Sequence, residues 1–174
     1  MKKRTIVLFG MLLMVLTAVA GGKIKVACVG NSVTWGMTIT DREKNCYPAQ
    51  LQKMLGDKYE VRNFGHSGTT LLQHGHRPYV DQKEYQDALN FKADLVIIHL
   101  GLNDTDPRNW PEYSEEFNAD YIRLIDNFRQ ANPKAKIWIC LMTPIFDRHP
   151  RFESGTRDWH AQIQKHIRQV ATAT

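Results

Sequence analysis

Three short motifs contain the residue types that acyl transfer requires. They are Gly30-Asn31-Ser32-Val33-Thr34-Trp35-Gly36, Asn63-Phe64-Gly65-His66-Ser67-Gly68 and Gly101-Leu102-Asn103-Asp104. A serine on a tight turn between glycines can present its hydroxyl to solvent, and a glycine lets a backbone N–H approach a ligand closely. The N–H groups of Ser32 and Gly65, with the side-chain amide of Asn103, could surround a developing oxyanion, which is the electrostatic arrangement of acyl transfer.

Each motif also has a structural interpretation. Ser32 could be a helix cap, Gly65 a turn former, and Asn103-Asp104 a loop cap. The common position of the motifs favours a functional site, because each of them follows a predicted strand. Ligands of open parallel sheets bind beyond the carboxyl ends of the strands, near the point where the strand order switches.

The elements that must position these motifs alternate between strands and helices. Short apolar runs predict strands over 24–29, 59–64, 95–100 and 136–142. Start and stop signals predict a helix over 48–55, and apolar residues at helical spacing predict helices over 117–128 and 159–170. This alternation is typical of an α/β fold with a mostly parallel sheet.

In these motifs the sequence resembles the SGNH (GDSL-like) hydrolase family, from residue 24 to about residue 170. The resemblance implies a flavodoxin-like, three-layer α/β/α sandwich with strand order 2-1-3-4. It also implies Ser32 as the nucleophile, with Ser32 N–H, Gly65 N–H and the Asn103 side chain as the oxyanion hole. Residues 41–55 further resemble bacterial members described as sialate or carbohydrate O-acetylesterases.

Two departures from the family pattern bear on activity. Asn31 stands where the family usually has Asp, but its amide keeps an acceptor oxygen that can organise the turn. The family's last strand and its catalytic Asp-x-x-His block are not present, so we expect the hydrolase domain, residues 21–174, to be incomplete at its C-terminal end. His149 and His160 are conceivable substitute bases, and without a base a serine is a poor nucleophile at neutral pH.

Other polar residues near the motifs are expected to line the site. Trp35, Ser67, His74 and His76 are candidate substrate contacts, whereas His99 lies inside a strand. Gly65 to Thr69 fails as a GxSxG nucleophile elbow, because Thr69 replaces the last glycine. No metal, nucleotide or other cofactor motif is found. The three cysteines lack a disulfide or zinc spacing and are expected to be small hydrophobic residues.

The first twenty residues predict a secretory signal peptide, with an uncleaved signal anchor as the alternative. Three basic residues precede a 14-residue uncharged stretch, and Ala18-Val19-Ala20 fits a cleavage site. Cleavage would lower the net charge from +5 to +2, so the mature chain offers no argument for nucleic-acid binding. We therefore expect a secreted or periplasmic protein with no stable membrane insertion.

The function expected from these observations is ester hydrolysis through an acyl-enzyme, with removal of O-acetyl groups from carbohydrate. The substrate would be a small-molecule or glycan ester. A lysophospholipase or thioesterase of the same family is the alternative enzyme. A non-catalytic fragment, or a carbohydrate-binding remnant without the His/Asp base, is the alternative from another class.

Overall fold

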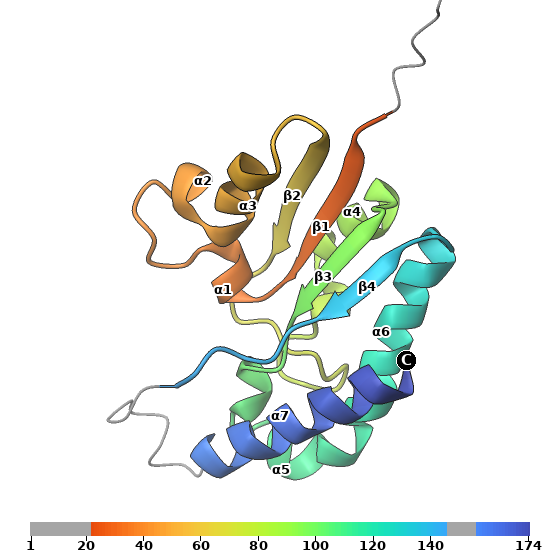
Figure 1. Ribbon diagram of the computed structural model, residues 1–174. Coiled ribbons are helices and arrows are strands. Elements are labelled where there is room, and N and C mark those ends of the chain that lie inside the picture. Colours follow the sequence, from red (N-terminus) through yellow and green to blue (C-terminus); the bar gives the residue numbers. More distant parts are fainter. Residues whose placement is uncertain (1–21, 146–155) are drawn as a thin grey trace, which may run out of the picture.

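The computed structural model, which describes residues 22–145 and 156–174, contains a four-stranded parallel sheet (Figure 1). Its strand order is β2-β1-β3-β4, with β1 at Ile24–Gly30, β2 at Tyr59–Gly65, β3 at Leu95–His99 and β4 at Lys136–Ile139. The predicted order and parallel pairing are confirmed. The signal peptide and His149 lie outside the described residues.

Helices pack on both faces of the sheet. The helices are α1 (Ser32–Trp35), α2 (Arg42–Asn45), α3 (Tyr47–Leu55), α4 (Lys83–Phe91), α5 (Trp110–Tyr113), α6 (Phe117–Ala131) and α7 (Thr156–Ala173). In Figure 1, α1 to α3 lie in front of β2 and β1, α4 and α6 lie behind the sheet, and α7 crosses below it against α6. This is the expected α/β sandwich.

Local signals explain several element boundaries. Pro48 occupies the first turn of α3, and Gly56 ends that helix in a positive-φ conformation (φ 71°) that favours glycine. The Gln52 side chain then joins α3 to β2, because its Oε1 accepts a hydrogen bond from the Val61 N–H at 2.8 Å. The helix and the strand that follows it are thus held together by one side chain.

The main core lies between the sheet and the helices α4 and α6. Val96 and Ile98 of β3 point into it, together with Ala27 and Val29 of β1. The apolar stripe predicted for α6 is buried as expected: Phe117, Tyr121, Leu124, Ile125 and Phe128. Burial of these side chains is the dominant favourable contribution to folding, at about 25 cal/mol per Å² of apolar surface.

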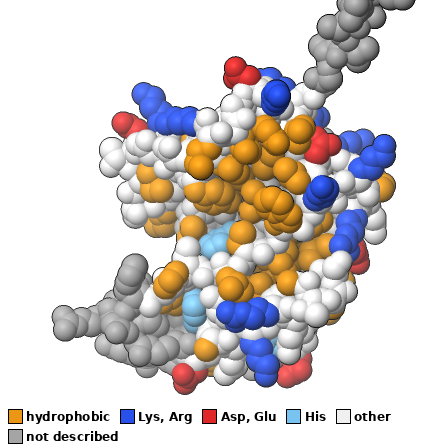
Figure 2. Space-filling model, viewed as in Figure 1, with side chains coloured by type: hydrophobic (Ala, Val, Ile, Leu, Met, Phe, Trp, Pro, Cys, Tyr) orange, Lys and Arg blue, Asp and Glu red, His pale blue; other side chains and the backbone are white. Residues whose placement is uncertain are grey.

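The opposite face of the sheet is open over β3 and β4. Trp138 of β4 is 58% exposed, and Ile24 and Leu141 are also exposed. Figure 2 shows hydrophobic side chains gathered across the middle of this face. Within the described residues, the outer edge of β4 has no neighbouring strand. Open edges of this kind invite pairing with other chains.

The structure differs from the sequence prediction in several places. The predicted strand over 136–142 ends at Ile139, because the backbone leaves the sheet after Cys140 donates its N–H to Ile98. Helix α4 was not predicted, although Tyr85, Ala88 and Phe91 bury one side of it. The three cysteines are free, with Cys28 and Cys46 buried as expected and Cys140 only half-buried.

Two buried tyrosines allow the contribution of a buried hydrogen bond to stability to be measured. The Tyr79 hydroxyl donates to the Phe64 carbonyl at 2.7 Å, whereas the Tyr121 hydroxyl is buried with no partner among the described residues. We predict that Tyr79→Phe lowers the free energy of unfolding by about 1–2 kcal/mol, whereas Tyr121→Phe leaves it unchanged or raises it. Urea unfolding of both variants measures this difference, and equal losses would contradict the prediction.

Candidate active site

Ser32 lies at the carboxyl end of β1, where the chain turns sharply into α1. The Asn31 side-chain oxygen accepts a hydrogen bond from the Val33 N–H at 3.0 Å, so Asn31 caps the helix as expected from its acceptor oxygen. Gly30 is required sterically, because a Cβ there would lie 2.1 Å from Thr34 Oγ1. Ser32 is half-buried, and its hydroxyl forms no hydrogen bond with a described residue.

The end of β2 packs directly against α1. The His66 N–H donates to the Gly30 carbonyl at 2.9 Å, and a Cβ on Gly65 would lie 2.3 Å from the Trp35 nitrogen. The Gly65 N–H, predicted as an oxyanion donor, donates to Asn63 Oδ1 at 2.9 Å. Close packing therefore explains the glycine at this position, and its N–H is already paired.

Gly68, three residues further on, was not singled out as an oxyanion donor by the sequence analysis. Its φ of +82° is a conformation that favours glycine. Its N–H has no hydrogen-bond partner in the described part of the chain. From the sequence, Gly68 could not be distinguished from an ordinary glycine in a turn.

Asn103 lies next to this same loop. Its side-chain Nδ2 donates to the Thr69 carbonyl at 2.9 Å, and the residue is buried at the start of a short 3-10 helix, Asn103–Thr105. An amide group carries two N–H donors, and this bond uses one of them. The second strand end and the third strand end therefore meet at the Asn103 side chain.

A set of buried acceptors holds the loop that follows β2. Asp104 accepts hydrogen bonds from the N–H groups of Leu71 at 3.0 Å and Leu72 at 2.8 Å. Further along the loop, the Gln73 N–H donates to Asp120 at 2.8 Å and the His76 N–H donates to Asn109 at 2.9 Å. Asp104 belongs to the third motif, and its structural role follows only from the tertiary contacts.

The other predicted site residues have partners of their own. His74 Nδ1 lies 2.7 Å from Glu116, and His76 Nδ1 lies 3.3 Å from Asn109 Oδ1. The Ser67 hydroxyl is buried without a described partner. His160 Nε2 lies 3.1 Å from the Thr143 carbonyl. Among the described residues, therefore, no histidine is hydrogen-bonded to Ser32.

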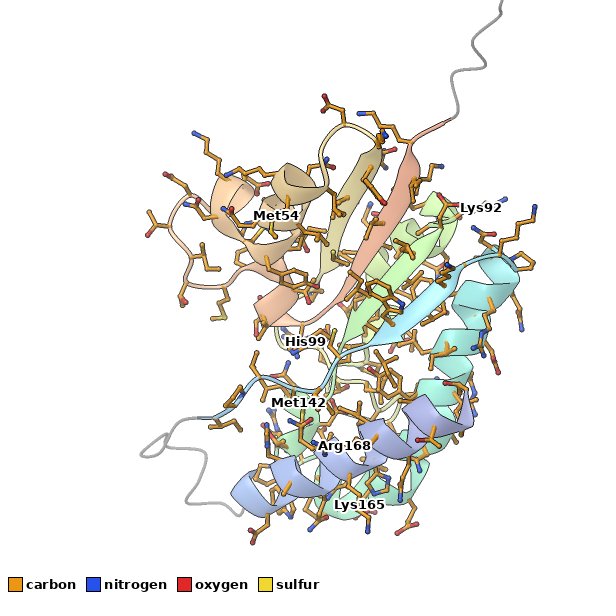
Figure 3. All side chains as sticks on the ribbon, viewed as in Figure 1. Met54, Lys92, His99, Met142, Lys165 and Arg168 are labelled. Atoms are coloured by element: carbon orange, nitrogen blue, oxygen red, sulfur yellow. The ribbon has the colours of Figure 1, made fainter. Side chains whose placement is uncertain are left out.

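His99 ends β3 close to the same crevice, as Figure 3 shows. It pairs in register with Gly30 of β1, and its Nδ1 is buried with no described partner. Burial lowers the pKa of His99, which keeps the ring neutral at pH 7. No group of three or more His, Cys, Asp or Glu residues in the described segments could hold a metal ion.

The fold and this arrangement define the class: an α/β sandwich protein with a serine on a tight turn at the carboxyl edge of a parallel sheet. A family model described as the GDSL-like Lipase/Acylhydrolase family matches residues 28–174. The chain belongs to this family.

Individual relatives agree with the family. An acetylxylan esterase of Xylanibacter ruminicola is 50% identical over 106 residues, which are 61% of this chain but only 22% of that protein. The matched region thus makes up about a fifth of the length of this curated relative.

Two solved structures share the fold. One, a carbohydrate acetylesterase family member from Sinorhizobium meliloti, has a TM-score of 0.65 and 23% identity, covering 86% of this chain and 78% of its own. The other, an acetyl xylan esterase called AlAXEase, has a TM-score of 0.60 and 21% identity, covering 86% of this chain and 73% of its own. At these identities the likeness concerns the fold alone.

The hydrogen bonds from Leu71 and Leu72 to Asp104 make the stability of the loop after β2 depend on pH. Burial raises the pKa of Asp104 from 3.8 to about 6, against the opposing effect of the two N–H groups. The folded chain therefore binds this proton more readily than the unfolded chain. The stability from this group is full below pH 4 and is lost as the pH rises through 6, by about 3 kcal/mol.

We predict that the free energy of unfolding of the parent protein, relative to Asp104→Asn, falls by about 2–3 kcal/mol between pH 4 and pH 7.5. Urea unfolding at several pH values measures this. Asp106→Asn is the matched control, because the Arg108 hydrogen bond lowers the pKa of Asp106 to about 2 and the sign is opposite. A pH-independent difference for Asp104→Asn would rule out the raised pKa.

Proposed function

We propose that this chain is the serine-containing part of an esterase that removes O-acetyl groups from carbohydrate through an acyl-enzyme. The position of Ser32, at the carboxyl end of β1 on the sharp turn that Asn31 caps, carries the proposal. The name of the relative from Xylanibacter ruminicola supports acetylated carbohydrate as the substrate class. Hydrolysis of an acetylated xylo-oligosaccharide, followed by acetate release, tests it directly.

In the proposed reaction the Ser32 hydroxyl attacks the acetyl carbonyl carbon and loses its proton to a base. The carbonyl oxygen becomes an oxyanion and accepts hydrogen bonds from the Ser32 N–H, the Asn103 amide and a glycine N–H. Gly65 is the donor expected from the sequence, and Gly68 is the donor whose N–H is unpaired. The sugar hydroxyl then leaves with a proton, and water hydrolyses the acetyl-serine.

A second candidate function is carbohydrate binding without turnover. It is favoured by one observation: no described histidine is hydrogen-bonded to the Ser32 hydroxyl, so no base is in place within the described residues. Release of a chromophore from a simple acetyl ester separates the two functions, since a binding module would leave that ester intact.

We also propose that the protein is exported, because residues 1–20 have the pattern of a signal peptide. No helix within the described ranges is long and apolar enough to cross a membrane. We predict that protein purified from an exporting host begins at or near Gly21. N-terminal sequencing measures the cleavage point, and a soluble exported chain that still contains Leu13 would contradict the prediction.

We predict that Ser32 is the residue that reacts with a fluorophosphonate, when the chain is extended with an Asp-x-x-His segment from a close relative. Ser32→Ala should abolish labelling and turnover. Asn103→Ala should lower the rate by about 10²–10³-fold, the scale of one oxyanion donor. Ser67→Ala is the matched control, and labelling lost in this variant but kept in Ser32→Ala would overturn the assignment.

The same extended chain tests the source of the base. The parent chain should show only the small residual rate that binding and an oxyanion hole provide, because no described base contacts Ser32. An added strand, followed by Asp-x-x-His, should raise both acetyl-ester turnover and the unfolding temperature, since it also covers the β4 edge. Full turnover by the parent chain, lost on His160→Ala or His149→Ala, would show that a substitute base exists.

A further inference from the structure

An exposed aromatic side chain stands one helical turn from the proposed nucleophile. Trp35 is the last residue of α1, three positions after Ser32, and residues at this spacing lie on neighbouring parts of a helix surface. Trp35 is 38% exposed, and the turn that follows exposes Met37 (56%) and Ile39 (40%). Such a group of apolar side chains beside a reactive residue indicates a surface that contacts a ligand.

One side of the indole ring is covered by a cation from the next helix. The Arg42 guanidinium lies 4.2 Å from the centre of the Trp35 ring, and Arg42 Nη1 donates to the Trp35 carbonyl at 3.2 Å. The same guanidinium contacts Glu43. A stacked guanidinium fixes the plane of an indole ring, and the exposed fraction shows that much of the ring still faces solvent.

The backbone of Trp35 is also fixed before any ligand binds. Its N–H donates to the Asn31 carbonyl at 2.9 Å, and its carbonyl accepts from Asn63 Nδ2 at 3.3 Å. The close approach of Gly65 to the Trp35 nitrogen prevents α1 from shifting toward β2. A ring held in this way loses little conformational entropy when it binds.

The surface of the protein is hollowed next to Arg42. A hollow of about 600 Å³ begins at Arg42 and is bordered by α2, α3 and β2. Its lining combines charged residues, among them Lys44 and Lys53, with apolar ones such as Pro48 and Val61. The ammonium groups of Lys44 and Lys53 can donate hydrogen bonds to sugar hydroxyls.

We propose that Trp35, held by Arg42, is a stacking platform for a pyranose ring of the glycan, next to the sugar that carries the acetyl group. This proposal rests on the proposed function and names the subsite that would select a polymer over a simple ester. The negative face of an indole attracts the partly positive C–H groups of a sugar ring. The pyranose would stack on the face of the ring that Arg42 leaves open.

Tryptophan fluorescence tests the platform without any need for turnover. The probe is acetylated xylotetraose, titrated into the full chain carrying Ser32→Ala, with xylose as the single-ring comparison. We expect a saturable change in emission for the tetraose, with much weaker binding of xylose. The change should survive in Trp138→Phe, the matched control, because Trp138 is also exposed but lies on β4. It should disappear in Trp35→Ala.

Calorimetry then measures affinity directly. Trp35→Ala should raise the dissociation constant for the tetraose about tenfold, which is the scale of one aromatic stacking contact. Trp35→Phe should retain most of the affinity. Arg42→Gln should give an intermediate loss, because it frees the ring without removing it. Thermal unfolding shows whether the variants are folded, and Trp35→Phe keeps the test valid if Trp35→Ala is not.

Three results would overturn the proposal. They are no saturable change in the parent protein, unchanged tetraose affinity in a folded Trp35→Ala variant, and a Trp35-dependent change produced by a lysophospholipid but not by the tetraose. Failure of the proposed function would appear differently, as acetyl-ester turnover that persists after Ser32→Ala. Binding and turnover are thus judged in separate measurements.

Discussion

The parallel pairing of β1 between β2 and β3 is the constraint on which the candidate site depends. Because the chain leaves β1 toward β2 and later returns to pair β3 on the other side, the carboxyl ends of all three strands lie at the same edge of the sheet. The strands β1 and β3 approach so closely that Gly30 admits no side chain, since a Cβ there would lie 2.6 Å from the His99 carbonyl, and α1 packs just as closely on Gly65. The turn that carries Ser32 can form only while this spacing is maintained, and the Asn31 cap then sets its direction.

Buried polar side chains hold the loop that follows β2 in place. Asn103 and Asp104 are adjacent in sequence but bind different parts of the loop after β2: one donates to a carbonyl, and the other accepts from two N–H groups. Asn109 joins them, because its Nδ2 donates to the Asn103 carbonyl at 2.9 Å. Networks in which each member is satisfied fix a single geometry, and partly satisfied ones are costly. Among the described residues of this region, the Asn31 amide nitrogen, the Ser67 hydroxyl and His99 Nδ1 are the exceptions, because each is buried without a hydrogen-bond partner.

The sequence predicted the sheet well, because β1 and β3 are short apolar runs that end in glycine-containing turns. It placed Ser32 at the end of a strand and expected the Asn31 oxygen to organise the turn, although it named Ser32 as the possible helix cap and the structure has Asn31 in that role. Helix α4 escaped prediction because its three buried positions are separated by charged and amide residues. The pairing of the Gly65 N–H with Asn63, and the contact of Arg42 with Trp35, depend on side-chain directions that only the folded chain defines. Spacing rules say which residues can meet at an edge, and they do not say which donor is already occupied.

The strand order also affects the stage of folding at which the ends of β1, β2 and β3 come together. Paired residues of β1 and β2 are 35 positions apart, as Ile24 and Tyr59 are, and those of β3 and β4 are 41 apart, as Leu95 and Lys136 are. The β1–β3 pair spans 69 positions, from Val26 to Leu95, and is the longest loop closure in the sheet. Closing a longer loop costs more chain entropy, and non-local pairing of parallel strands is slow. The β1–α3–β2 unit can therefore assemble first, and the turn that carries Ser32 gains its neighbours from the end of β3 only when the two halves of the sheet join.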